Sequence, residues 1–284
     1  MPKNLFVYAA LVFVGKLFDL RALGKVTLAF LLFSLVAGSV YLLNDLLDIE
    51  SDRAHPEKRR RPIASGKLPT SLAWLELFLF GVGGITAGFL LKPAFGLTLL
   101  AYLILQITYC FSLKHIVLLD VFTIALGFVL RTVAGGAVLS VHVSHWLLLC
   151  TLLLALFLGF GKRRQELVLM GGKAGQSRAI LKEYSLAYLD QMINIVSGAT
   201  IVCYSVYSIE SETAKSHPHL WITVPFVIFG VFRYMYLVYQ KGWGGAPDEV
   251  LLKDRTLQID IALWLVAALV LLKFDTATLS IFGQ

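Results

Sequence analysis

The chain has 284 residues, of which 58% are hydrophobic and only 15% charged, with a mean hydropathy of +0.77. This composition excludes an ordinary soluble domain and is typical of a polytopic membrane protein. The formal net charge is +7, but the basic residues are scattered over short segments between apolar runs, which argues against a nucleic-acid-binding protein.

Nine apolar runs approach the roughly 20 residues that a helix needs to cross a bilayer. The runs are continuous rather than alternating, so we expect helices and not barrel strands. The first run is expected to be a helix rather than a cleaved signal peptide, because no small-residue cleavage site follows it. We therefore expect one all-α integral-membrane domain over residues 1–284, a bundle of about nine transmembrane helices. The expected spans are 5–20, 26–47, 70–91, 94–112, 117–139, 144–161, 187–209, 219–239 and 257–273.

The basic residues predict the orientation of this bundle. If the N-terminus is cytoplasmic, 17 of the 25 Lys and Arg residues fall in cytoplasmic segments, as the positive-inside rule requires. We expect a multi-pass membrane protein with its N-terminus and its charged loops in the cytoplasm. Cys110, Cys150 and Cys203 lie far apart in the sequence, each within an apolar run, and are expected to be free buried thiols.

The second apolar run ends in a cluster of acids, in the sequence YLLNDLLDIESDRAHPEKRRRPIASG. If the helix continues to Asp52, then Asn44, Asp45, Asp48 and Asp52 share an arc of about 100°, whereas Glu50 points to the opposite side. Carboxylates that lie so close together resist joint ionisation unless a cation neutralises them. Mg²⁺ suits carboxylates that share the ion with phosphate oxygens. The alternative is a solvated helix end whose acids pair with neighbouring arginines. Pro56 is expected to end the helix. Donors for further phosphate charge follow at Lys58, Arg59 and Arg61.

Three later segments also carry charge close to expected spans. Asp120 and Arg131 are eleven residues apart and lie on nearly the same helix face, so Arg131 needs either a structural partner on another helix or a ligand. Lys162 and Glu166 are one turn apart and could form a simple ion pair. In the last loop, Asp248, Glu249, Asp254 and Arg255 could close over a site, or Asp254 and Arg255 could cap the final helix.

The pattern N-D-x-x-D-x-x-x-D at Asn44, Asp45, Asp48 and Asp52 resembles the first aspartate-rich motif of the UbiA-type intramembrane prenyltransferases. The longer stretch around it resembles one branch of them, the decaprenyl-phosphate phosphoribosyltransferases of bacterial cell-wall arabinan synthesis. The resemblance implies a UbiA-type fold whose active-site cavity opens on the cytoplasmic face. It also implies catalytic Asp45, Asp48 and Asp52 binding Mg²⁺, 5-phosphoribosyl 1-diphosphate as donor, a polyprenyl phosphate lipid as acceptor, and release of diphosphate.

The same resemblance implies the substrate-binding residues. Tyr109, Lys114 and Asp120 resemble the branch's counterpart of an aromatic-lysine element. Where aromatic prenyltransferases carry a second aspartate motif, this chain has Lys162, Arg163 and Glu166. Ahead of the first helix, only Lys3 and Asn4 match a stretch similar to R-P-x-x-W-x-K-N. The expected set is Lys3, Asn44, Lys58, Arg59, Arg61, Tyr109, Lys114, Asp120, Arg131, Lys162, Arg163 and Glu166.

Two rival functions are weighed against this one. A UbiA-type aromatic prenyltransferase would transfer a prenyl group to an acceptor such as 4-hydroxybenzoate, but the missing second aspartate motif argues against it. A transporter or lipid flippase would place ionisable residues near the midpoints of several spans, whereas here they concentrate at one membrane face. The sequence is compatible with a homo-oligomer and does not indicate the length of the lipid.

Overall fold

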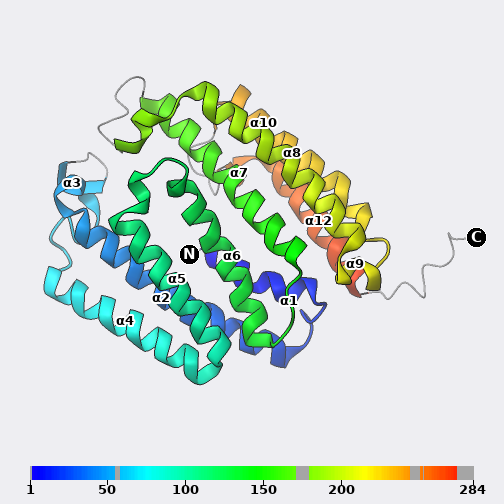
Figure 1. Cartoon of the computed structure of the whole chain (residues 1–284), viewed down its shortest axis with the longest axis horizontal. Coiled ribbons are helices and arrows are strands. Elements are labelled where there is room, and N and C mark those ends of the chain that lie inside the picture. Colours follow the sequence, from blue (N-terminus) through cyan, green and yellow to red (C-terminus); the bar gives the residue numbers. More distant parts are fainter. Residues whose placement is uncertain (1, 55–57, 171–178, 244–249, 252, 274–284) are drawn as a thin grey trace, which may run out of the picture. The chain divides into compact units, whose positions relative to one another are not determined.

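The computed structural model describes residues 2–54, 58–170, 179–243, 250–251 and 253–273. These residues are helical or lie in short connections, and no strand occurs among them, which confirms the expected all-α class (Figure 1). Pro56, Asp248 and Glu249, to which the sequence assigned a helix end and a covering loop, lie outside the described residues. The chain divides into two compact units. Unit 1 comprises Met1–Leu11 and Asp19–His142, and unit 2 comprises Val12–Phe18 and Val143–Gln284.

In the described part of the chain, eight helical segments are long and apolar enough to cross a membrane. Each corresponds to one of the expected runs, so the chain is a multi-pass membrane protein. The helices are α2 (Leu20–Leu47), α4 (Thr70–Leu91), α5 (Pro93–Phe111), α6 (Leu119–Leu139), α7 (His145–Met170), α8 (Leu186–Glu210), α10 (Val224–Gln240, preceded by the short helix η6, Leu220–Thr223) and α12 (Arg255–Lys273).

The ninth expected span, at residues 5–20, is wrong in length. It is a 3₁₀ helix η1 (Pro2–Tyr8) followed by a single short helix α1 (Ala9–Phe13). The chain then turns at Gly15, whose φ of +70° is a conformation that glycine adopts readily and other residues rarely do. Asp19 caps the next helix by accepting hydrogen bonds from the backbone amides of Arg21 and Ala22, so α2 begins at Leu20 rather than at 26.

Unit 1 is built around α2, which packs against α4, α5, α6 and η1 (Figure 1). The close approach of η1 to α6 requires a glycine at position 135. A Cβ atom there would overlap the carbonyl oxygen of Val7, so any larger residue would force η1 away from α6. The N-terminal segment is thereby held against the bundle, and it places Asn4 in the interior, where only 1% of its surface is exposed.

The buried guanidinium of Arg131 connects several elements of unit 1. Its Nε donates to Asn4 Oδ1 at 2.8 Å, and its Nη2 donates to the Tyr102 hydroxyl at 2.9 Å. A third bond, from Nη1 to the carbonyl oxygen of Gly127, is 2.8 Å long. The Asn4 amide in turn donates to Ser34 Oγ on α2. The sequence left open whether Arg131 has a structural partner on another helix or contacts a ligand. The structure shows structural partners on η1 and α5.

Unit 2 contains α7, α8, α10 and α12, with α7 packed along α8 and α10 packed on α12. A cluster of buried side chains between these helices includes Leu147, Tyr204, Tyr207 and Leu220. Trp264 Nε1 donates to the Tyr204 hydroxyl at 2.9 Å, which ties α12 to α8. Buried polar groups of this kind specify how membrane helices pack, because an unpaired donor in an apolar layer is costly.

Asp254 begins the last helix of unit 2. Its Oδ1 accepts a hydrogen bond from the Leu257 amide at 2.7 Å, which confirms the capping role that the sequence offered as an alternative. Its carboxylate also accepts bonds from Nε and Nη2 of Arg233, at 3.2 and 2.8 Å. The hydrogen bonds from the Arg233 guanidinium lower the pKa of the Asp254 carboxyl below its usual range.

Replacing Asp254 with asparagine is expected to lower the free energy of unfolding by about 1 kcal/mol at neutral pH, because the amide can still cap Leu257 but loses the charged pair. Since the pKa of Asp254 is lowered in the folded chain, this stabilisation is present above the ordinary aspartate pKa of about 3.9 and is lost as the pH falls through the lower folded value. Thermal midpoints in detergent at several pH values test this. The gap between wild type and variant should narrow only in acid, and a gap that stays constant there would contradict the ion pair's role.

Candidate active site

The acidic cluster lies at the end of α2 in unit 1. Helix α2 stops at Leu47 and α3 (Ile49–Ala54) follows after a single interrupted residue, Asp48. The Asp48 amide donates to the Asn44 carbonyl at 3.0 Å and the Asp52 amide donates to the Asp48 carbonyl at 2.8 Å. Because both bonds span four residues, helical spacing continues through the interruption. The continuation to Asp52 that the sequence analysis assumed is therefore nearly correct.

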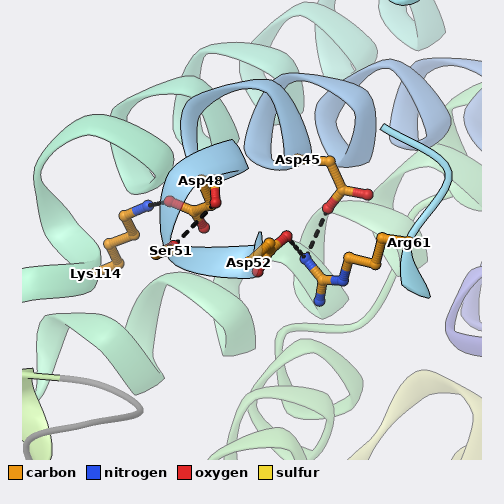
Figure 2. A network of polar contacts seen from close by, with 6 residues as sticks. All are labelled: Asp45, Asp48, Ser51, Asp52, Arg61 and Lys114. Atoms are coloured by element: carbon orange, nitrogen blue, oxygen red, sulfur yellow. Dashed lines mark hydrogen bonds and ion pairs between the residues drawn. The ribbon is translucent and has the colours of Figure 1, made fainter. Parts of the chain in front are cut away.

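Asp45 and Asp52 converge on one nitrogen atom. Arg61 Nη1 lies 2.8 Å from Asp45 Oδ1 and 2.8 Å from Asp52 Oδ2, as Figure 2 shows. Asp52 is almost entirely buried, with 2% of its side chain exposed, whereas 37% of the Arg61 side chain is exposed. Helical spacing put the two aspartates about 20° apart around the helix axis, and they do share one side of it.

Asp48 faces a different cation. Lys114 Nζ lies 3.1 Å from Asp48 Oδ1, and Figure 2 shows this pair directed away from Arg61. Lys114 belongs to a short 3₁₀ helix, η3 (Leu113–His115), that connects α5 to α6. The fold thus brings Lys114 to a residue 66 positions earlier in the chain. Glu50 is exposed, in agreement with the prediction that it points away from the three aspartates.

The carboxylate oxygens of two of the three aspartates, Asp45 and Asp52, are suitable ligands for a divalent cation. Among the residues that the structure describes, no three Asp, Glu, His or Cys side chains are grouped closely enough to hold a metal ion, and Asp48 pairs with Lys114 instead of joining Asp45 and Asp52. The acids pair with bases, as the alternative predicted, but two of them share a single nitrogen. Carboxylate oxygens that converge in this way are ligands that Mg²⁺ prefers. A site formed by all three aspartates stays a prediction.

The remaining substrate-binding residues predicted for unit 1 lie on several different elements. Lys58 and Arg59 belong to a short 3₁₀ helix, η2 (Lys58–Arg60), just before Arg61; Lys58 is half-buried and Arg59 is exposed. Asn44 and Tyr109 are half-buried, Asp120 is fully buried in the first turn of α6, and Lys3 is exposed. The contacts gather Asp45, Asp48, Asp52, Arg61 and Lys114 into one network, whereas Arg131 bonds to Asn4 and Tyr102 instead.

The predicted cations of unit 2 lie at the end of α7. Arg163 is 2% exposed, and its Nη1 lies 2.6 Å from Glu166 Oε2. The ion pair that the structure shows for Glu166 is formed with Arg163, three residues earlier, whereas the sequence alternative proposed Lys162 as its partner. Sequence reasoning missed Arg164, which pairs with Asp190 on α8 and lies over the ring of Tyr239. In the run Lys162, Arg163 and Arg164, the sequence alone does not indicate that Arg164 joins α7 to α8 rather than binding a substrate.

The sequence model of the UbiA prenyltransferase family matches residues 4–164, more than half of the chain. The chain belongs to the UbiA prenyltransferase family. Membership confirms the family that the aspartate motif indicated, and it covers η1, the whole acidic cluster and the start of the charged end of α7.

Curated relatives of this UbiA-family chain extend over most of its length. The protein named "Decaprenyl-phosphate phosphoribosyltransferase" from Mycobacterium tuberculosis (strain ATCC 25618 / H37Rv) is 34% identical over 267 residues, which cover 93% of this chain and 88% of that protein. The protein of the same name from Mycolicibacterium smegmatis is 35% identical over 274 residues, covering 93% and 86%. These relatives are transferases, and they confirm that the chain is an enzyme of this class.

A solved structure of a UbiA homolog from Archaeoglobus fulgidus bound to DMAPP and Mg²⁺ superimposes with a TM-score of 0.70. The superposition covers 95% of this chain and 96% of that one at 18% sequence identity. At this identity the likeness establishes the UbiA fold alone, and it confirms the fold that the sequence predicted.

Proposed function

We propose that this UbiA-family enzyme catalyses the Mg²⁺-dependent transfer of the 5-phosphoribosyl group from phosphoribosyl diphosphate to a polyprenyl phosphate such as decaprenyl phosphate. Diphosphate is released, and the product is a precursor for cell-wall arabinan. The observation that supports this proposal most directly is the 34–35% identity, over 93% of the chain, to proteins named decaprenyl-phosphate phosphoribosyltransferase. We further propose that residues 1–284 form a single transferase domain in a bacterial plasma membrane, with the N-terminus and the charged loops in the cytoplasm.

The reaction exchanges one carbon–oxygen bond for another. An oxygen of the lipid phosphate bonds to the anomeric carbon of ribose, and the bond from that carbon to the diphosphate breaks, with its electron pair leaving on the diphosphate. A lipid phosphate is already ionised at neutral pH, so no residue needs to remove a proton from the acceptor. The chain therefore needs groups that bind and orient two phosphorylated substrates, and the site supplies charged groups of that kind.

Asp45, Asp48 and Asp52 are the residues that would hold Mg²⁺. When bound, the ion supplies positive charge for the oxygens of the diphosphate leaving group. Arg61 and Lys114 already lie beside these carboxylates, and their N–H groups can donate to diphosphate oxygens. Lys58 and Arg59 are further proposed phosphate-binding cations, and the candidates for binding the 5-phosphate of the donor are Lys162, Arg163, Arg59 or Arg61. Asn44, Tyr109, Asp120, Glu166 and Lys3 complete the proposed substrate contacts on the basis of the family resemblance.

Two substrate pairs test the proposal on purified protein in detergent. The first is labelled phosphoribosyl diphosphate with decaprenyl phosphate, and the second is a labelled prenyl diphosphate with 4-hydroxybenzoate. We expect labelled lipid from the first pair only, and we expect that product to disappear when EDTA removes the metal. Product from the second pair alone would identify the enzyme as an aromatic prenyltransferase and overturn the proposal.

Replacing Arg61 with glutamine is expected to change the metal dependence and the rate in opposite directions. The variant lacks the guanidinium that competes for Asp45 and Asp52, so half-maximal activity should require less Mg²⁺. It also lacks one donor to the diphosphate, so the maximal rate should fall about tenfold. Titration of Mg²⁺ in the transfer assay measures both effects. Lys67→Gln removes an exposed charge from the same loop and serves as the control. A higher Mg²⁺ requirement in Arg61→Gln would show that Arg61 supports the metal rather than competing with it.

A further inference from the structure

Two of the three cysteines lie side by side in unit 2, although 53 residues separate them in the sequence. Cys150 Sγ on α7 lies 3.4 Å from Cys203 Sγ on α8, so the two thiols are in van der Waals contact. Cys203 Sγ also lies 3.9 Å from the carbonyl oxygen of Trp146, one turn before Cys150. The third thiol, Cys110, is buried in α5 of unit 1.

The surrounding packing holds this pair in place. Cys150 packs against the buried cluster that contains Leu147, Tyr204, Tyr207 and Leu220. Tyr204 follows Cys203 directly and is fixed by hydrogen bonds with Thr223 and Trp264. Rigid packing on both sides restricts rotation of α7 against α8, so the two sulfur atoms stay near each other.

We propose that Cys150 and Cys203 are a dithiol that closes to a disulfide joining α7 to α8, with a membrane-soluble quinone as oxidant. Each sulfur loses its hydrogen and a bond forms between the two sulfur atoms. The two electrons and two protons pass to the two oxygens of the quinone, which becomes a quinol. The sulfurs need to approach by about 1.4 Å to reach disulfide bond length.

The position of the thiols determines the class of oxidant. Both lie within helices that are apolar enough to span the membrane, so a charged oxidant has poor access to them. A quinone is soluble in the apolar layer and accepts two electrons together with two protons, so it is the class of oxidant that we propose. Cys150 is half-buried and Cys203 is buried.

Thiol counting on the full-length protein tests this site. The purified chain in detergent is treated with tetramethyl-1,4-benzoquinone, which has no free ring position for addition of a thiol, and is then denatured and labelled with a maleimide that carries a polyethylene glycol tag. The untreated chain has three cysteines and should take three tags. After treatment we expect one tag, and we expect all three to return after reduction with dithiothreitol.

Two variants identify the thiols that pair. Cys110→Ser should fall from two tags to none, whereas Cys203→Ser should keep both of its tags after the same treatment. The proposal is overturned if the wild-type chain keeps three tags. It is also overturned if Cys203→Ser loses its tags as wild type does, or if reduction does not restore them. Because the readout is a thiol count, it is independent of whether the proposed transfer reaction is correct.

Discussion

Replacing Asp45 with alanine is expected to lower the rate of phosphoribosyl transfer by about 10²-fold or more, with little change in the fold. Asp45 and Asp52 meet at Arg61 Nη1, so removal of one carboxylate leaves a divalent ion with only one of the two converging groups. Transfer of labelled phosphoribose into the lipid, measured over a range of Mg²⁺ concentrations, checks the result. Added Mg²⁺ should recover only part of the rate, since the ligand itself is missing.

Glu50→Ala is the matched control for this experiment. It removes an acid from the same helical segment, but Glu50 is exposed and lies on the other side of the helix, so the transfer rate should stay near that of wild type. Asp48→Ala should behave like Asp45→Ala if Asp48 leaves Lys114 to bind the metal. Full activity in Asp45→Ala, with a normal thermal midpoint, would remove the acidic cluster from the catalytic site.

Replacing Arg131 with methionine is expected to lower the free energy of unfolding by about 3 kcal/mol, which should appear as a thermal midpoint several degrees lower in detergent. The substitution keeps much of the apolar stem but leaves Asn4 Oδ1 and the Tyr102 hydroxyl without the donors that they have in the wild type. It also removes the cation from among the rings of Phe33, Tyr102 and Phe128.

The kinetic constants of the same variant separate a structural role from substrate binding. If Arg131 only ties η1 to α5 and α6, the folded fraction of Arg131→Met should keep a normal KM for both substrates at low temperature. An unchanged thermal midpoint together with a strongly raised KM for the donor would instead place Arg131 in contact with the substrate.

Most of the fold could be predicted from the apolar runs, because a bilayer requires long continuous helices and eight such runs became spans. The expected bounds differ from the structure near the N-terminus and at the end of α7, which continues to Met170 rather than ending at 161. The expected span began at 26, after Arg21 and Lys25, but the Asp19 cap starts α2 at Leu20, and long basic side chains are tolerated near a helix end. Gly15 is compatible with both a helix and a turn, so the sequence did not indicate that the first run is interrupted there.

The candidate site could be predicted only as far as one helix determines it. Regular spacing places Asp45 and Asp52 on a common side and Glu50 on the other, since that geometry is local. The partners of the aspartates are not local. Arg61 reaches them from a loop, and Lys114 arrives from a connection 66 residues from Asp48. The contact between Cys150 and Cys203 likewise depends on how α7 packs on α8, which the spacing of cysteines along the chain does not encode.

The guanidinium shared by Asp45 and Asp52 has a consequence for ion selectivity. It offsets part of the mutual repulsion between the two carboxylates in the metal-free protein. An incoming ion must then outcompete a cation that is already hydrogen-bonded to both carboxylates. Sodium or potassium carries no more positive charge than the arginine, whereas a divalent ion carries more. In the proposed metal site, Arg61 would therefore disfavour binding of the abundant monovalent ions of the cell.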